Sequence, residues 1–203
     1  MVRQFLTLLA LLVTISMASA ETESPLWGGR PEASVWSKAT RDALSSHGKG
    51  LLETVPQDIR TWCPAYPRND KAERAAFWTG FLSALAKHES TWRPAAVGGG
   101  GRWFGLVQIQ PSTARAYGCA ARTGSALKDG TANLSCAIRI MAKTVQRDQA
   151  IARRAGARAG VGADWGPLVQ PRKRAQMIAA VKSQPYCEDI RSVVPAIRPE
   201  EAG

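Results

Sequence analysis

One acidic residue, Glu89, lies where a strong helical pattern ends, and its position suits proton-transfer chemistry. It directly follows the apolar stretch 70–88 and precedes Trp92 and Pro94. A carboxylate at a helix C-terminus is close to the negative end of the helix dipole, and shielding by Trp92, Trp103 or Phe104 would add a desolvation cost. Both effects raise the pKa, because both disfavour the charged form. We therefore expect a general acid that is protonated near neutral pH; the alternative is an exposed helix-end carboxylate.

A glycine-rich segment and a short motif follow Glu89-Ser90. The four glycines Gly98 to Gly101 predict a loop or flap, because glycine weakens the interiors of helices and strands. Residues 104–110 (F-G-L-V-Q-I-Q) have strand propensity. Pro111 then opens a helix that runs through Tyr117. We expect these segments to position whatever surrounds Glu89.

Four other segments have recognisable local patterns. Apolar spacing predicts helices over 32–47 and 70–88, the second with a capping box of Asp70 and Glu73 at its start. Asn133 predicts the start of a helix of about 15 residues. The basic stretch 152–163 is interpreted as a mobile connection, and Pro171 opens a last helix. The total is a mainly helical chain, in which Trp36 and Trp78 are expected to pack in the core.

The order of these motifs resembles the soluble lytic transglycosylase family of the lysozyme-like superfamily. The resemblance depends on Glu89-Ser90, the glycine-rich turn and G-L-V-Q-I-x-P-x-T-A at residues 105–114, with Val107 where the family usually has Met. It covers about residues 75–145, and Asn133 matches a downstream Asn that usually opens a helix in the family. It implies a mainly α (α+β) lysozyme-like fold with little sheet, in which a Glu-bearing helix end faces a sugar groove.

The resemblance also implies a role for each matching residue. Glu89 would be the single general acid and base. It would protonate the glycosidic oxygen between N-acetylmuramic acid and N-acetylglucosamine, and then take a proton from the C6 hydroxyl as a 1,6-anhydro ring closes. Ser90 would order the glutamate or the substrate. The other groove candidates are Gly105, Val107, Gln108, Ile109, Asn133, Trp103, Tyr117 and Trp165.

The sequence departs from the family in its late part. Many relatives carry an A-Y-N-x-G element whose Tyr touches the catalytic carboxylate, whereas this chain has A-D-W-G-P at 163–167. Trp165 could fill the aromatic role but lacks the hydroxyl that would bond to the carboxylate. Tyr117 or Tyr186 could supply this hydroxyl, or no residue does. The sequence therefore leaves this side of the groove open.

The number of carboxylates bears on the reaction type. No Asp or Glu occurs between Glu89 and Asp129, whereas most glycosidases use two carboxylates that flank the bond. Asp129, Asp148 and Asp164 could approach in the folded chain, although nothing in the sequence marks them. A single carboxylate favours ring closure over hydrolysis. The alternatives are a muramidase-type hydrolase, and a wall-binding or secretion-associated module with little turnover.

The first 20 residues have the pattern of a secretory signal peptide. A short start with Arg3 is followed by the apolar run 5–15 and by small residues up to Ala20. The apolar run is too short to span a bilayer, so no stable membrane anchor is expected after cleavage. We expect a lead-in over 21–31, one domain over 32–190 and a tail over 191–203, exported to the periplasm or secreted as a monomer.

Export makes disulfides the expected state of the four cysteines. Three pairings are possible. Cys119 and Cys136 are the closest pair in sequence, which favours a local bridge and leaves Cys63 to join Cys187. A zinc site is not expected, because no C-x-x-C occurs and the chain has two histidines. No cofactor is expected.

The chain is basic, with 27 Lys and Arg against 16 Asp and Glu and a net charge of +11. No nucleic-acid motif accompanies this charge, and export also argues against such a partner. A cationic surface would attract a cell-wall polymer whose peptide stems carry carboxylates; a solvated cationic face with no partner is the alternative. The late basic residues are Arg153, Arg154, Arg158, Arg172, Lys173 and Arg174.

Overall fold

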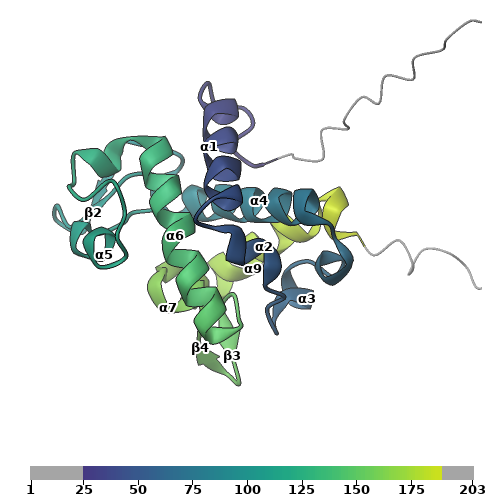
Figure 1. Ribbon diagram of the computed structural model, residues 1–203. Helices are drawn as coiled ribbons and strands as arrows, with labels where there is room; N and C mark the ends of the chain where they lie inside the picture. Colours follow the sequence, from purple (N-terminus) through teal and green to yellow (C-terminus); the bar gives the residue numbers. More distant parts are fainter. Residues whose placement is uncertain (1–24, 189–203) are drawn as a thin grey trace, which may run out of the picture.

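Helix α4 (Lys71–Ser90) runs through the middle of the molecule, and the other helices pack around it (Figure 1). The computed structural model describes residues 25–188. The other α-helices are α1 (Ala33–Ser45), α2 (Lys49–Glu53), α3 (Ile59–Trp62), α5 (Pro111–Ala116), α6 (Gly130–Asp148), α7 (Val161–Asp164), α8 (Gly166–Val169) and α9 (Pro171–Lys182). The short 3-10 helices are η1 (Tyr66–Arg68), η2 (Ala126–Lys128) and η3 (Pro185–Cys187). The fold class is therefore mainly α, as the sequence predicts.

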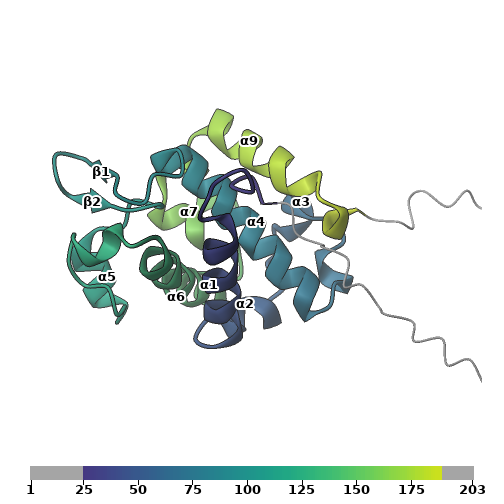
Figure 2. The same ribbon diagram turned by 90° about the horizontal axis from the view of Figure 1, so that it is seen from above.

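The strands of the described chain form two small antiparallel hairpins. One pairs β1 (Val97–Gly98) with β2 (Trp103–Phe104), and the other pairs β3 (Arg153–Arg154) with β4 (Ala157–Arg158). Hairpin β1–β2 and α5 lie at the opposite end of the molecule from α3 (Figure 2). Hairpin β3–β4 follows the C-terminal end of α6.

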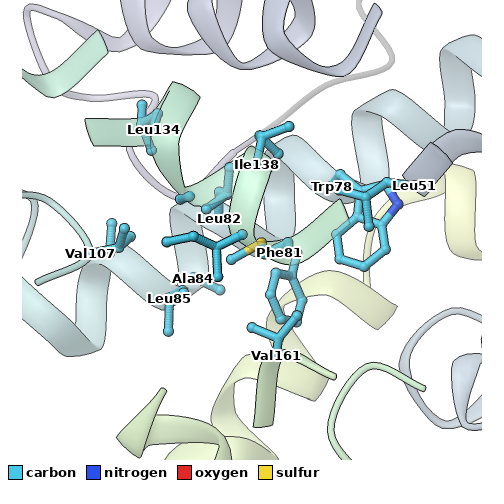
Figure 3. Packing of buried hydrophobic residues seen from close by; sticks show 14 of the residues in the cluster. Leu51, Trp78, Phe81, Leu82, Ala84, Leu85, Val107, Leu134, Ile138 and Val161 are labelled. Atoms are coloured by element: carbon cyan, nitrogen blue, oxygen red, sulfur yellow. The ribbon is translucent and has the colours of Figure 1, made fainter. Parts of the chain in front are cut away.

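Helix α4 begins at the predicted capping box. The Asp70 carboxylate accepts a hydrogen bond from the Glu73 N–H, and the Glu73 carboxylate accepts one from the Asp70 N–H, each at 2.9 Å. The helix then differs from the expected single apolar stripe, because every residue from Ala76 to Ala86 is buried. A helix that is buried all round is one that other elements enclose. Helices α1 and α9 both pack on it (Figure 3 shows part of this core).

Helix α6 begins earlier than the sequence predicts. Asp129, not Asn133, is the N-cap, and its side chain accepts a hydrogen bond from the Ala132 N–H at 2.8 Å. Both residue types are good caps, so local sequence does not distinguish them. Asn133 falls in the first turns of the helix and is fully buried, which leaves its amide free for contacts with another segment.

Two other local predictions are wrong. Residues 104–110 do not form a continuous strand: Gly105 and Gln108 have positive φ values of 84° and 49°, and the chain turns back so that Phe104 and Ile109 pair as an isolated bridge. The stretch 152–163 is also not a loose connection, because it forms β3, β4 and the start of α7. The Asp58 carboxylate fixes its beginning by accepting hydrogen bonds from three consecutive backbone N–H groups, those of residues 151–153, at 2.7–3.1 Å.

Disulfides link Cys63 to Cys187 and Cys119 to Cys136, which is the pairing that the sequence favours. The first bridge joins residues 124 apart in sequence, and it ties η3 to the end of α3; η3 also packs on α4. Gly80 of α4 allows this approach, because a Cβ there would collide with the Tyr186 hydroxyl.

The packed part of the chain includes residues before α1. Trp27, within the segment expected to be a lead-in, is fully buried, and its backbone N–H donates to the Ser83 hydroxyl at 2.8 Å. Trp36 and Trp78 are in the core, as predicted. The expected signal peptide and tail lie outside the described residues. Within residues 25–188, no helix combines the length and the apolar character that a bilayer span needs.

Candidate active site

Glu89 lies in the last turn of α4 and lines a cavity of about 340 Å³. Its side chain is half-buried. Around it, the walls come from the β1–β2 hairpin, the 105–109 turn, α7, α8 and α9. The lining residues used below are His88, Trp103, Gln108, Asp164, Trp165 and Lys173. The structure therefore brings Glu89 together with three of the groove candidates, Trp103, Gln108 and Trp165.

Burial raises the pKa of Glu89 to about 7, and the nearby Lys173 ammonium opposes this rise. The direction is the predicted one, and the source is removal of the carboxylate from water. Of the two tryptophans expected to shield Glu89, Trp103 lines the cavity, whereas the indole N–H of Trp92 donates to the Ser83 carbonyl at 2.9 Å. A carboxyl with this pKa can release and recover a proton near neutral pH.

The residues after Glu89 hold the end of the helix. Ser90 is buried, and its hydroxyl donates to the Ala86 carbonyl at 3.3 Å and accepts from the Arg93 N–H at 3.2 Å. Thr91 and Trp92 both adopt left-handed backbone conformations, with φ values of 53° and 55°. Ser90 therefore fixes the helix end that presents Glu89, and it does not line the cavity wall.

Asn133 organises the turn on the other side of the cavity. Its Oδ1 accepts from the Val107 N–H, and its Nδ2 donates to the Phe104 and Leu127 carbonyls, each at 3.0 Å. Gly105 packs so closely against the Asn133 amide that a Cβ would collide with it. Gly105, Val107 and Asn133 are thus buried supports, not part of the cavity wall.

Gln108 and Ile109 lie nearer the open space. Gln108 has a left-handed backbone, and its amide donates to the Gly105 and Ala96 carbonyls at 2.9 and 3.3 Å, which ties the base of the β1–β2 hairpin to the turn. Ile109 does not contact the Glu89 cavity but lines a neighbouring cavity of about 140 Å³. A non-glycine residue with positive φ next to a cavity is a common sign of a functional site.

We expect Asn133→Ala to destabilise the protein by about 3 kcal/mol, because it leaves a buried N–H and two buried carbonyls without partners. Chemical denaturation measures this loss. Lys143→Ala, at an exposed position of the same helix, is the matched control and should change stability by less than about 0.5 kcal/mol. A similar small change for Asn133→Ala would contradict the supporting role.

The two late aromatic candidates have different positions. Trp165 lines the cavity and is nearly buried, and its indole N–H donates to the Val107 carbonyl at 2.8 Å. Tyr117 is not part of the cavity wall and lies where the charges of Arg147 and Asp164 act on it. Tyr186 is buried against α4 near Gly80. Neither tyrosine takes the place of the family hydroxyl beside Glu89.

Of the three aspartates that the sequence allowed to approach Glu89 without marking any of them, Asp164 is the one on the cavity wall. It lines the Glu89 cavity and also the neighbouring one. Its only sequence signal is its place in the A-D-W-G-P segment, where many relatives have an aromatic residue. No group of His, Cys, Asp and Glu residues within the described part of the chain could hold a metal ion.

Comparison with known proteins agrees with the lysozyme-like fold. Residues 67–160 match the sequence model of the transglycosylase SLT domain. Three solved structures of Bd0314 DslA, its wild-type form 2 and two mutants with a glutamate changed to glutamine, are similar to this chain, with TM-scores of 0.76, 0.77 and 0.76. Each is 28% identical and covers 83% of this chain and 100% of its own. No match is found among curated protein sequences.

Proposed function

Because the chain belongs to the transglycosylase SLT family, we propose that it is a peptidoglycan lytic transglycosylase with Glu89 as its single acid and base. The observation that carries this proposal is the half-buried Glu89 carboxyl, with a pKa of about 7, in a cavity that Trp103 also lines. An aromatic face beside an acid suits a sugar ring held for protonation of its glycosidic oxygen.

In the proposed reaction, Glu89 donates its proton to the oxygen that links N-acetylmuramic acid to N-acetylglucosamine. The bond from the anomeric carbon to that oxygen breaks, and positive charge develops at the anomeric carbon. The C6 hydroxyl oxygen of the same muramic acid then bonds to this carbon, while Glu89 takes the hydroxyl proton. The enzyme regains its starting state, and the product ends in a 1,6-anhydro ring. No cofactor takes part.

The cationic surface supports a wall polymer as the partner. Arg153, Arg154 and Arg158 are exposed on the β3–β4 hairpin, and Arg172 is exposed at the start of α9. Peptide stems with carboxylates would be drawn to this surface and reach the cavity faster. We further propose that the chain is exported to the periplasm or medium, where both disulfides persist, and works there as a monomer without a membrane anchor.

Product analysis tests the proposal. The purified chain is incubated with cell-wall sacculi, and the released fragments are identified by mass spectrometry. Muropeptides with an anhydro end are expected. Reducing-end muramic acid would instead identify a hydrolase, and binding without released product would identify a wall-binding module; either result overturns the proposal.

The rate should fall as pH rises through about 7, because the general acid must be protonated. Lys173 lowers the pKa of Glu89, so Lys173→Met should raise this pKa and move the alkaline limb of the kcat profile to higher pH. Lys182→Met, in the exposed last turn of the same helix, is the matched control and should leave the limb in place. The His88 pKa is lowered by burial and then by Lys173, so His88→Gln should not move the limb either. A shift of the alkaline limb in His88→Gln would contradict the assignment of this limb to Glu89.

A further inference from the structure

A second carboxylate, that of Asp164, lies on the wall of the Glu89 cavity. It belongs to α7, just beyond residues 67–160 that match the SLT domain. The Glu89 cavity and its neighbour share four lining residues, Trp103, Gln108, Asp164 and Trp165. Asp164 is therefore at the junction of the two cavities, where a glycan that passes Glu89 would continue.

The backbone that carries Asp164 is firmly held. The Trp165 indole N–H donates to the Val107 carbonyl at 2.8 Å, and the Trp165 backbone N–H donates to the Val161 carbonyl at 3.1 Å. On the other side of α7, Gly162 packs so closely on Ala152 that a Cβ would collide with its backbone. Its N–H also donates to the Ile151 carbonyl at 3.0 Å. The carboxylate thus projects from a fixed point on the cavity wall.

The Asp164 carboxylate is not committed to another group. Within residues 25–188, no hydrogen bond or salt bridge to it is present. Arg147 is the cation whose charge acts on it, but the Arg147 guanidinium forms two hydrogen bonds to Asp148, at 2.6 and 2.8 Å. Asp148 in turn accepts from the Gly160 N–H at 2.6 Å. The Asp164 side chain is therefore exposed, and its carboxylate is available to contact a ligand in the cavity.

We propose that Asp164 is a second catalytic carboxylate, which contacts the glycan and stabilises the positive charge that develops at its anomeric carbon. This inference rests on the proposed function. In the proposed reaction Glu89 performs both proton transfers, and Asp164 is the other carboxylate on the cavity wall, so it is the group of this chain that can face the positive charge on the sugar ring. Asp164 forms no covalent bond and exchanges no proton in the reaction. Fixed charge aimed at a developing charge is an effective way to lower a barrier.

The charges around the site fit this division of roles. Burial raises the pKa of Asp164 and Asp148 adds to the rise, whereas Arg147 lowers it; the Tyr117 hydroxyl also lies within reach of its charge. Burial raises the pKa of Glu89, and the Lys173 ammonium opposes this rise. Two carboxyl groups with different environments can hold an acid and an anion at one pH. Removal of Asp164 should therefore slow the reaction without moving the titration of Glu89.

The test compares Asp164→Asn with Asp42→Asn, which makes the same charge change in an exposed ion pair with Lys38 on α1. The kcat and KM values for glycan strands are measured against pH, with the products identified. For Asp164→Asn we expect a loss of about 100-fold in kcat, a change of less than about 3-fold in KM and an unmoved alkaline limb. Asp164→Glu should recover part of the rate, and Asp42→Asn should match the wild type.

Three outcomes would overturn the inference. One is a kcat for Asp164→Asn within about 2-fold of the Asp42→Asn control. Another is a shift of the Glu89 limb that accounts for the lost rate, which would show an indirect effect. The third is a loss confined to KM with kcat unchanged, which would show that Asp164 binds the glycan without stabilising the charge. The products of the wild-type protein test the proposed function separately. Failure of the proposed function can therefore be distinguished from failure of the role proposed for Asp164.

Discussion

Glu89→Gln should lower kcat by at least about 10³-fold and leave binding to sacculi unchanged. General acid–base catalysis by one positioned group contributes about 10² to 10⁴, and here the same group serves both proton transfers. Glutamine keeps the size and the hydrogen-bonding capacity of the protonated acid but cannot release a proton. The measurement is the rate of product release, together with cosedimentation of the variant with sacculi.

Glu53→Gln is the matched control, because Glu53 is exposed at the end of α2 and does not line the Glu89 cavity. It should retain the wild-type rate. Undiminished activity of Glu89→Gln would show that another residue is the acid. A loss of sacculus binding in step with the rate would point to a defect in the fold, which the melting temperature would reveal.

Removal of the Cys63–Cys187 bridge should have the largest effect on stability. It closes a loop of 124 residues, and loop-closure entropy gives about 4–5 kcal/mol for a loop of this length. The Cys119–Cys136 bridge spans 17 residues, for which the same relation gives about 3 kcal/mol. We therefore expect the Cys63→Ala/Cys187→Ala double variant to be less stable than the Cys119→Ala/Cys136→Ala variant.

Urea denaturation of the two double variants measures the difference. Each bridge is buried, so both variants also lose packing, and the comparison between them removes much of this shared cost. An equal loss of unfolding free energy in the two variants, or a larger loss for the shorter loop, would contradict this expectation. It would show that the bridges stabilise the protein mainly through packing in the folded state and not by restricting the unfolded chain.

The features predicted best from the sequence are those that neighbouring residues determine. The capping box of Asp70 and Glu73 requires only a spacing of three, and the structure contains it. Pro111 and Pro171 each begin a helix, as their fixed φ favours. The position of Glu89 at the end of α4 follows from the same local pattern. Local chemistry therefore gives the main helices and the central candidate of the site.

The features that the sequence does not predict depend on distant partners. Asp58 fixes the start of the β3–β4 segment from more than 90 residues away, so a basic, glycine-containing stretch has an ordered shape that its own composition does not indicate. By residue type Asn133 is as good an N-cap as Asp129, but its side-chain amide forms hydrogen bonds to the backbone of the turn at 104–107. Long-range contacts override local preference in both places.

The candidate site also contains residues that the sequence predicts and residues that it does not. Glu89 and Gln108 are recognisable from a motif, whereas Asp164 reaches the cavity only because α7 is held against the Val107 turn by Trp165. Its distance from Glu89 along the chain conceals this proximity. The stretch between Glu89 and Asp129 lacks Asp and Glu, but the folded cavity wall holds two carboxylates, those of Glu89 and Asp164.

The burial of α4 on every side has a consequence for how the protein loses activity on heating. The acid lies three residues beyond Ala76–Ala86, the stretch of α4 that the core encloses, so the body of the helix that carries it unfolds only with the core. Loss of activity on heating and cooperative unfolding should therefore occur in one transition. The fluorescence of a buried tryptophan would then report the fraction of active enzyme that remains.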